Sequence, residues 1–517
     1  MPTAYEIYQT YLKGPAALIR LFKQALGTKA IYGQPPPDQQ QRTIDAQAEE
    51  IDRLQSQITH LQQELAHQQH LNCQLLRRNS ELEARLVKDS HNSSRPPSSD
   101  HPAVKRTQSL RRPSGKRPGG QLGHPGHTRP LVARPWRVIH HRVPRCHRCQ
   151  SSLLVAQVLH HERRQVIEMV PQRLRVTEHR AEVKRCPSCG ARTKGAFPTE
   201  VRAAVQYGDS IKARALYLQQ YQLLPYARVG EVMRDLFGCS VSQGTIFSQV
   251  GSCAQELIET ELKIKRRLRR SSVIHSDETG LRVDGKCHYV HVTSTPRLTH
   301  YACDVRRGRG AIEAIDILPR YRGTMVHDGW SAYSFYPQCR HGLCGAHLLR
   351  ELTFFIELSE ESKGWAEPLL KLLLEIKRKV EAVRAEGGER RDDERQATLT
   401  LCYERLVDEG LMANPPPEEK EQVKQQARNL LLRLQRRQEE VLLFMRDLTV
   451  PFDNNQAERD LRMVKLRQKT SGCFRTEQGA ANFCRIRSYL SSVRKQEKPV
   501  LKALQRACQQ RPLSLTS

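Results

Sequence analysis

The stretch HSDET at residues 275–279 decides the fold, because it closes a short apolar run and so predicts a strand that ends on an aspartate. HDGW at residues 327–330 closes a second such run in the same way. Much later, DNNQAER at residues 453–459 opens a helix with a glutamate in its second turn. Three carboxylates from separate elements are what two divalent cations need to clamp a phosphate during an in-line displacement. The pattern favours an enzyme that cuts and joins nucleic acid.

Each of these three acids has an ordinary explanation when it is taken alone. Asp277 and Asp328 could cap turns at the ends of their strands, and Glu458 could pair with Arg462 one helical turn away. All three together, in this order and on these elements, are better explained by a shared function. We therefore predict that Asp277, Asp328 and Glu458 form one site.

Two nearby acids and one Cys/His pair are rival candidates. Glu278 follows Asp277 directly, and its side chain should point to the opposite face of the strand. Asp304 ends another strand, where we expect it to pair with Arg306 or Arg307. Cys344 and His347 could form a metal-binding pair, although burial beside a helix is the commoner explanation.

The elements around the first two acids predict an α/β core. Strands are expected at residues 272–277, 287–293, 298–304 and 324–328, with a turn at 294–297 and a helix at 311–318. Three antiparallel strands, a helix and a further strand follow the order of a ribonuclease-H-like core. Ligands of open α/β sheets gather at strand ends, so both aspartates would lie where chemistry takes place.

An all-helical insertion should separate the second acid from the third. Residues 344–450 contain no convincing strand pattern, and leucine-rich helical segments are expected at residues 369–380, 397–407 and 422–445. After it, Asp453 and Gln456 have the spacing of a helix capping pair. The stripe that should be buried consists of Ala457, Leu461 and Val464.

Composition indicates a polyanionic partner. The 517 residues include 84 Lys and Arg against 55 Asp and Glu, a formal net charge of +29, which predicts attraction to nucleic acid. No apolar run approaches the roughly 20 residues that span a bilayer, and the first residues have no signal-peptide pattern, so no membrane partner is expected. Four of the fifteen cysteines lie in two Cys-x-x-Cys motifs. This spacing favours a reduced, cytoplasmic protein with a bound metal over one with disulfides.

A heptad repeat runs from residue 44 to residue 86. One core position is filled by Ile44, Ile51, Ile58, Leu65, Asn72, Asn79 and Leu86, and the other by Gln47, Leu54, Leu61, Gln68, Leu75 and Leu82. Ile at the first position and Leu at the second favour a parallel two-stranded coiled coil, with buried Asn fixing its register. The alternative is a single amphipathic helix packed on the chain's own body, which would need a wider apolar stripe.

Residues 89–135 are rich in Ser, Pro, Gly and basic residues and cannot bury enough apolar surface to fold alone. Cations such as Lys116 and Arg117 could lie along DNA phosphates, or the stretch could be a solvated linker, and both could hold.

Two Cys-x-x-Cys turns follow this stretch, and together they predict a closed, structural Zn²⁺ site. The four ligands would be Cys146, Cys149, Cys186 and Cys189. The interval between the pairs reads as strands at residues 164–170 and 173–184, so a hairpin could bring the pairs together. The alternative is four unrelated free thiols.

Residues 206–262 are expected to form three helices, at about 210–221, 225–238 and 243–262. Gly238 stands where a helix-ending glycine is expected, and Ser242 can cap the third helix. Tight turns between three helices suggest a helix-turn-helix that reads the major groove, although plain helical packing produces the same pattern. The basic residues that follow should lie close to DNA: Arg266, Arg267, Arg269 and Arg270.

These motifs, in this order, resemble the DDE transposases of the insertion-sequence-66 family. The resemblance covers most of the chain and includes GKRPGGQLGH at residues 115–124, DET at 277–279, DGW at 328–330, NNQAER at 454–459 and TSG at 470–472. It implies that Asp277, Asp328 and Glu458 are the catalytic acids of a ribonuclease-H-like core, and that they hold two Mg²⁺ ions. It further implies strand cleavage and strand transfer at the terminal inverted repeats of an insertion sequence.

The resemblance also implies partners and a location. The partners would be double-stranded DNA at the element ends and at the target, a second copy of the chain in a homo-oligomer, and accessory proteins encoded by the same element. The protein would be a cytoplasmic, nucleoid-associated bacterial one. The alternatives are a non-catalytic DNA-binding protein derived from a transposase, which loss of one acid would have favoured, and an RNA-cleaving nuclease, which needs no DNA-binding modules.

The fold class predicted is therefore multidomain α+β. The expected parts are an N-terminal helix and leucine-zipper-like coiled coil (1–90), a basic linker (91–137), a zinc-binding module (138–200), a helical DNA-binding region (201–270), the first part of the catalytic core (271–343), an all-helical insertion (344–450) and the last part of the core (451–517).

Overall fold

The computed structural model describes residues 2–26, 37–87, 92, 130–168, 174–387, 393–416 and 422–516. Contacts divide the chain into two compact units, Met1–Glu83 and Ala84–Ser517. The described residues combine helices with a mixed sheet, as expected for an α+β chain. No helix among them is long and apolar enough to cross a membrane.

The first unit is helical. It contains α1 (Ala4–Tyr11), α2 (Pro15–Leu26) and the 51-residue helix α3 (Pro37–Val87), which holds the predicted heptads. Four central heptad residues are 46 to 62% exposed: Ile51, Leu54, Ile58 and Leu61. Leaving this seam in water forgoes about 25 cal/mol for each Å² of apolar surface that a partner could cover.

The second unit is built on a five-stranded sheet with the strand order β5-β4-β3-β6-β7. The strands are β3 (Val273–Val283), β4 (Lys286–Ser294), β5 (Thr299–Asp304), β6 (Thr324–His327) and β7 (Arg340–Leu343). β4 pairs antiparallel with both β3 and β5, whereas β6 runs parallel to β3 and β7 parallel to β6. The first strand in chain order is therefore the central one.

β3 continues beyond its predicted end. Asp277 lies in the middle of the 11-residue strand and is paired with β4. β3 and β4 turn at Asp284 and Gly285, both at positive φ (48° and 72°), which is the two-residue turn that Asp-Gly favours. On the side of β3 that pairs with β4, the prediction that the strand ends at Asp277 was wrong. On the other side, pairing with β6 stops at His275, so Asp277 lies just beyond it.

The last strand, β7, was not predicted. It has only four residues, RHGL, and its buried half consists of Gly342 and Leu343, which carry no β-branched signal. Three short helical elements lie between β5 and β7: α8 (Arg309–Ile315), and the 3-10 turns η3 (Leu318–Arg320) and η4 (Ser331–Phe335). The helix predicted at residues 311–318 is α8, displaced toward the N-terminus.

The helices before the sheet follow the predicted capping signals. They are α4 (Asp209–Leu216), continued by the π-helical turn η2 (Tyr217–Tyr221), α5 (Tyr226–Phe237), α6 (Gln243–Glu256) and α7 (Ile258–Arg269). Gly238 ends α5 at a φ of 62°, and the Ser242 side chain accepts the Thr245 N–H to cap α6, as predicted. The predicted third helix is in fact two helices, because the chain bends at Leu257.

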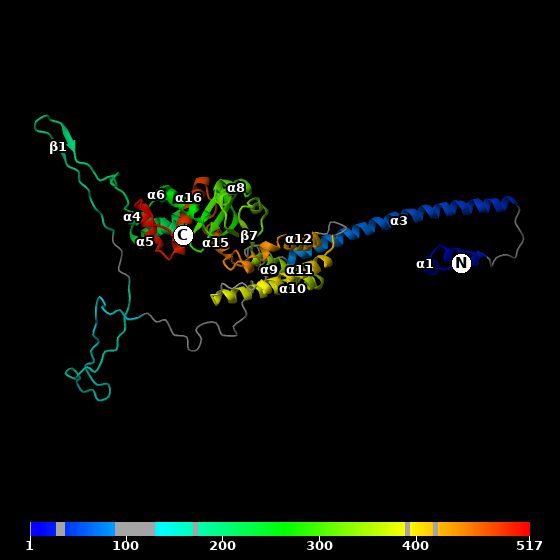
Figure 1. Cartoon of the computed structure of the whole chain (residues 1–517), viewed down its shortest axis with the longest axis horizontal. Coiled ribbons are helices and arrows are strands. Elements are labelled where there is room, and N and C mark those ends of the chain that lie inside the picture. Colours follow the sequence, from blue (N-terminus) through cyan, green and yellow to red (C-terminus); the bar gives the residue numbers. More distant parts are fainter. Residues whose placement is uncertain are drawn as a thin grey trace. The chain divides into compact units, whose positions relative to one another are not determined.

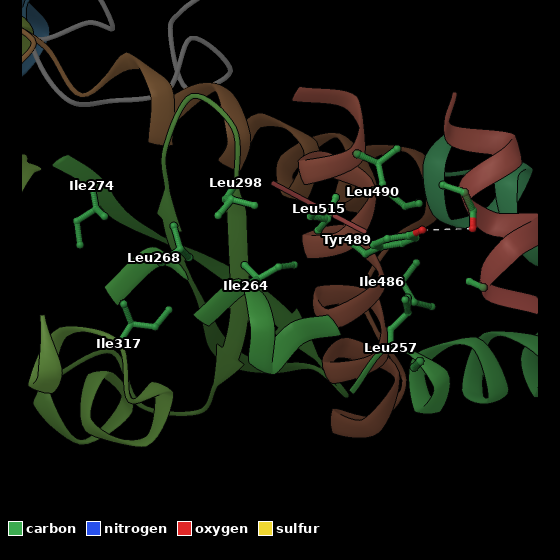
Figure 2. Close-up of a cluster of buried hydrophobic side chains, with 14 of the residues drawn as sticks. Leu257, Ile264, Leu268, Ile274, Leu298, Ile317, Ile486, Tyr489, Leu490 and Leu515 are labelled. Atoms are coloured by element: carbon green, nitrogen blue, oxygen red, sulfur yellow. Dashed lines mark hydrogen bonds between the residues drawn. The ribbon is translucent and has the colours of Figure 1, made fainter. Parts of the chain in front are cut away.

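These helices share a core with the sheet and with the C-terminal helices. The latter are α15 (Asn455–Ser471), α16 (Glu477–Lys495) and α17 (Val500–Cys508). Figure 2 shows Ile264 and Leu268 of α7 in the same buried cluster as Ile486 and Leu490 of α16. The region predicted to bind DNA is thus packed onto the five-stranded sheet through a common apolar core.

Helix α16 also covers the edge of the sheet. The hydroxyls of Ser488 and Ser492 accept hydrogen bonds from the N–H groups of Tyr301 (2.8 Å) and Thr299 (2.9 Å) in β5. Free N–H groups on an edge strand invite pairing with other chains. The helix satisfies two of them.

The described residues between β7 and α15 are helical, as predicted. The helices are α9 (Gly345–Leu358), α10 (Glu360–Ala385), α11 (Asp393–Ala413), α12 (Gln422–Arg436), α13 (Gln438–Val441) and α14 (Leu443–Arg446), and Figure 1 labels the first four of them. Their buried side chains form an apolar core together with Leu343 and Phe452. The two ends of this insertion meet, because the Gly345 N–H donates to the Phe452 carbonyl at 2.8 Å. A Cβ at Gly345 would overlap the Phe452 ring, so this close approach requires glycine.

Candidate active site and metal centres

The three predicted acids come from three elements around the centre of the sheet. Asp277 lies on β3, Asp328 follows the last residue of β6, and Glu458 lies in the first turn of α15. The buried stripe of α15 packs this helix against β3 and β4, as predicted: Ala457, Leu461 and Val464. Glu458 is thereby held over the strand that carries Asp277.

The pKa of Asp277 is raised by burial and by the neighbouring acids. Burial raises it well above its ordinary value, and the charges of Glu278, Asp328 and Glu458 raise it further. The Glu278 N–H, donated to Asp277 Oδ1 at 2.8 Å, opposes the shift only in part. The site therefore concentrates negative charge that its own hydrogen bonds do not neutralise, which is the environment that a divalent cation stabilises.

Glu278 is engaged in other contacts. Its carboxylate is 2% exposed, accepts hydrogen bonds from Arg307 (2.7 Å) and from the Tyr333 hydroxyl (3.0 Å), and so cannot move freely toward a metal. Asp304 pairs with Arg306 at 3.1 Å, which confirms the expected ion pair. The two rival acids thus have structural partners.

The capping pair predicted for α15 was wrong. The cap residue is Asn454, whose side chain does not cap the helix, and Asp453 accepts the Asn455 N–H instead. Asn454 is fully buried; its Nδ2 donates to the Ser276 carbonyl (2.9 Å), and its Oδ1 accepts from His275 Nδ1 (3.0 Å). This side chain ties the start of the Glu458 helix to the strand of Asp277.

The backbone of Asn454 makes a further link. Its N–H donates to Cys344 Sγ at 3.1 Å, and the Cys344 N–H donates to the His327 carbonyl at 2.8 Å, beside Asp328. We call Asn454, Cys344 and His275 the clasp, because together they join the three segments that carry the acids. Sequence reasoning missed the clasp; the only signal was a polar residue directly before a buried helical stripe.

One oxygen of Glu458 is occupied by the insertion. Its Oε1 lies 3.2 Å from Arg350 Nη2 and 3.6 Å from His347 Nδ1, both on α9. Among the described residues Glu458 pairs with these two groups and not with Arg462, the partner considered from sequence.

The loop that carries Asp328 is fixed by histidines. The Gly329 N–H donates to His327 Nδ1 (3.1 Å), so the neutral ring carries its proton on Nε2 and donates it to His341 Nδ1 (3.1 Å). His341 in turn donates from Nε2 to the Tyr336 carbonyl at 3.0 Å. Arg437 of the insertion donates to the Gly329 carbonyl at 3.3 Å, which braces the same loop.

The two cysteine pairs lie in matching turns. In each, the N–H of the first cysteine donates to the carbonyl five positions later, and the N–H four positions later donates back, at 2.8 to 3.0 Å. Gln150 and Gly190 occupy the same place in the two turns, at φ of 59° and 76°. The Ser151 hydroxyl lowers the pKa of Cys149 to about 7, which favours the thiolate that binds metal.

The hairpin predicted between the pairs was wrong where the structure describes it. Residues 164–168 and 174–182 form no strand; β1 (Val183–Arg185) and β2 (Arg192–Lys194) instead pair across the second cysteine turn. Residues 169–173, with the predicted turn, lie outside the described residues. In the described part of the chain no group of three ligating side chains joins Cys146 and Cys149 to the second pair, so a single four-cysteine site stays a prediction.

The basic residues predicted to contact DNA differ in their exposure and in their ion pairs. Arg266 and Arg270 are exposed at the end of α7, and Arg267 is half-buried. Arg269 is held by Asp316, at 2.5 Å to its carboxylate and 2.7 Å to its carbonyl. Lys116 and Arg117 lie outside the described residues.

Three family models match the chain. One described as the transposase IS66 family matches residues 204–482, more than half of the chain, and includes all three acids. One described as the zinc-finger binding domain of transposase IS66 matches residues 144–190, with all four cysteines. A family of unknown function matches residues 34–130. No curated protein matches the chain.

Proposed function

This chain belongs to the IS66 transposase family, and we propose that it is a DDE-type enzyme that cleaves the ends of an insertion sequence and joins them to target DNA. The observation that carries the proposal is the clasp, which holds together three elements whose acids share one electrostatic field. A protein that only bound DNA would have no need of this concentration of unneutralised charge. A non-catalytic DNA-binding protein is the alternative that the cleavage test distinguishes.

The sheet supports a ribonuclease-H-like core. Its chain-order arrangement, with an antiparallel second strand beside the central first strand and parallel fourth and fifth strands on the other side, is the order expected for that fold. Asp277 on the central strand β3 and Asp328 after its parallel neighbour β6 lie near the point where the strand order reverses. Open α/β sheets bind their ligands at such a switch point.

Two Mg²⁺ ions held by Asp277, Asp328 and Glu458 would supply an activated water or 3′-hydroxyl and stabilise the leaving 3′-oxygen. The chain's own residues set the geometry. Arg350 fixes one oxygen of Glu458, and the His327–His341 hydrogen bond fixes the Asp328 loop. Arg307 and the Tyr333 hydroxyl hold the Glu278 carboxylate in place beside the site.

The test is cleavage of a labelled duplex that carries the terminal inverted repeat flanking the gene. We expect strand breaks with Mg²⁺ and none with a chelator, and joining of the new 3′ ends to a second duplex. Specific binding without any break, over a range of Mg²⁺ and Mn²⁺ concentrations, would favour the non-catalytic alternative. Accessory proteins of the same element are added in a second series.

Removal of the Arg350 contact should change the metal requirement. We expect Arg350→Gln to lower cleavage about 10- to 100-fold at limiting Mg²⁺, the usual cost of losing a partner of a metal ligand. Higher Mg²⁺ should recover part of it, because Glu458 is misoriented and not lost. A Mg²⁺ titration measures this, with Arg462→Gln as the matched control. Equal Mg²⁺ dependence in Arg350→Gln and the wild type would contradict the role.

Zinc binding follows from the zinc-finger match, and we propose that the four cysteines share one structural Zn²⁺ per chain. Cys146→Ser should release it and weaken DNA binding while the catalytic acids are left intact, because a structural zinc contributes folding free energy to its own module. Metal analysis of purified protein checks the stoichiometry, and gel shift the binding. Purified wild-type protein without zinc would refute the site.

Helix α3 is proposed to form a parallel coiled coil that pairs two chains, one for each element end. Polar substitution of Ile51, Leu54, Ile58 and Leu61 should give a monomer that binds single ends but does not cleave paired ends, since the exposed seam is the apolar surface that association would bury. Light scattering on the full chain decides this. A monomeric wild type, with and without DNA ends, would mean that pairing occurs elsewhere.

The exposed arginines at the end of α7 and the basic stretch with Lys116 and Arg117 are proposed to contact DNA phosphates, which would make binding steeply salt-dependent. We infer that the protein acts in the cytoplasm, on the nucleoid.

A further inference from the structure

Three chemically different side chains meet at the start of α9. Cys344 directly precedes the helix, His347 lies in its first turn, and Glu458 reaches it from α15. One ligand atom from each, a sulfur, a ring nitrogen and a carboxylate oxygen, lies within 4.8 Å of the other two. The Cys344 thiol already accepts the Asn454 N–H in the clasp, but phosphoryl transfer with Mg²⁺ gives no reason for an imidazole beside it.

His347 has a nitrogen without a hydrogen bond. Its Nδ1 is buried and has no hydrogen-bond partner among the described residues; Glu458 Oε1, at 3.6 Å, is too distant to accept one. An unsatisfied buried polar atom costs about 1–3 kcal/mol. An ion bound between the nitrogen and the carboxylate oxygen would remove that cost.

The sulfur is also set up as a ligand. The Asn454 N–H donates to Cys344 Sγ at 3.1 Å, the kind of outer contact that orients and stabilises a metal-bound thiolate. Cys344 is buried, whereas the side chains of His347 and Glu458 are 17 and 21% exposed, so an ion can arrive from their side.

We propose that Cys344, His347 and Glu458 form a second metal site, for a borderline-soft divalent ion of the Zn²⁺ class, separate from the cysteine turns. Zn²⁺ accepts sulfur, nitrogen and oxygen ligands and is often held by three side chains with an open fourth position. Mg²⁺ takes oxygen ligands and does not suit this set. Binding releases the thiol proton of Cys344 to solvent.

The site shares Glu458 with the proposed Mg²⁺ centre, so the two kinds of ion compete for one carboxylate. Bound Zn²⁺ would draw Glu458 toward α9 and inhibit cleavage. This consequence rests on the proposed function, whereas the binding itself does not.

A second trio of possible ligands is already satisfied. His327 and His341 use their facing nitrogens in a hydrogen bond to each other, and the proton placement dictated by the Gly329 N–H leaves His327 Nε2 without a free lone pair. Glu440, the third member, is paired with Arg437. This trio needs no ion.

The binding experiment uses the full chain with its tightly held zinc, titrated with ZnCl₂ without DNA or Mg²⁺. We expect a further equivalent of zinc to bind to the wild type. His347→Phe keeps a ring but no nitrogen, and Cys344→Ser keeps an acceptor for the Asn454 N–H; both should lose that equivalent. The exposed Cys473 provides the control, since Cys473→Ser should retain it. Thermal unfolding checks that each variant is folded, and His347→Phe decides if Cys344→Ser is not.

The activity experiment adds zinc to the Mg²⁺-dependent cleavage assay. Cleavage by the wild type and Cys473→Ser should be lost as the additional site fills, and more Mg²⁺ should restore it. His347→Phe, relative to its own zinc-free activity, should show no such loss.

The outcomes separate the two proposals. No additional equivalent in the wild type, or one that survives His347→Phe, would overturn the site; its loss in His341→Gln but not in His347→Phe would assign it to the other trio. Cleavage unaffected by site-bound zinc would overturn the competition. A chain that binds the additional zinc but never cleaves DNA would refute the proposed function and leave the site in place.

Discussion

Asp277→Asn should lower Mg²⁺-dependent cleavage by more than about 100-fold. Loss of a residue that only orients a metal ligand already costs about 10- to 100-fold, and Asp277 is proposed to be a ligand itself. Asp328→Asn and Glu458→Gln should do the same. The amide keeps the shape of the side chain but removes the charge that holds Mg²⁺. DNA binding, measured by gel shift on the same duplex, should be nearly unchanged.

The matched control is Asp304→Asn, which makes the same change in an acid that ends the edge strand β5 and pairs with Arg306. It should retain most of the activity. Any of the three variants that retained most of its strand transfer with Mg²⁺ would remove that residue from the proposed site.

Asp277→Asn should also stabilise the metal-free protein at neutral pH. The folded-state pKa of Asp277 is raised well above its ordinary value, so the folded chain holds this proton more tightly than the unfolded chain. Metal-free stability therefore falls as pH rises from the ordinary carboxyl range toward the raised pKa, and stays low above it. Asp277→Asn should weaken that fall and also reduce the stabilisation that Mg²⁺ gives the wild type. Thermal unfolding over pH, with and without Mg²⁺, measures both.

Asn454→Ala should be the most damaging change outside the acids. It leaves the buried Ser276 carbonyl and His275 Nδ1 without their partners, and at about 1–3 kcal/mol for each unsatisfied group the loss is about 2–6 kcal/mol. Cleavage should fall as well, because the Glu458 helix loses its link to the Asp277 strand. Thermal unfolding and the Mg²⁺ titration of cleavage test the two effects separately.

Asn455, the neighbour of Asn454, supplies the control. Asn455 starts α15 and is only half-buried, so Asn455→Ala should leave the thermal midpoint nearly unchanged. Equal midpoints for the two alanine variants would show that the Asn454 side chain does not hold the acids together.

Patterns that repeat along the chain were sufficient to predict much of the fold. The buried stripe of α15, the glycine that ends α5 and the serine that caps α6 were read correctly, because each depends on local periodicity or on a single terminal residue. β7 was missed because four residues with a glycine carry no periodic signal. The length of β3 was misjudged because the acidic residues at its centre looked like an end, while the Asp284-Gly285 turn signal was overlooked.

The site was harder to predict because its supports are distant in sequence. The acids themselves stood out from their motifs and their order. Asn454 and Cys344 lie 110 positions apart and meet only in the folded chain. The cap of α15 was assigned to Asp453 and Gln456 because their local spacing allowed it, so the role of Asn454 was missed. Arg350 and Arg437 belong to an insertion whose helices carry no marker of which residue faces the core.

The hydrogen bond between Gly345 and Phe452 makes the insertion a loop whose two ends are fixed together. For a flexible segment, the entropic cost of closing such a loop grows by only about 0.6 kcal/mol for each doubling of its length. The outer helices can therefore gain or lose residues over evolutionary time without moving the acids, provided that the first turns of α9 and the Arg437 contact remain. The architecture separates a part of the chain that must be kept from a part that is free to diverge and acquire new partners.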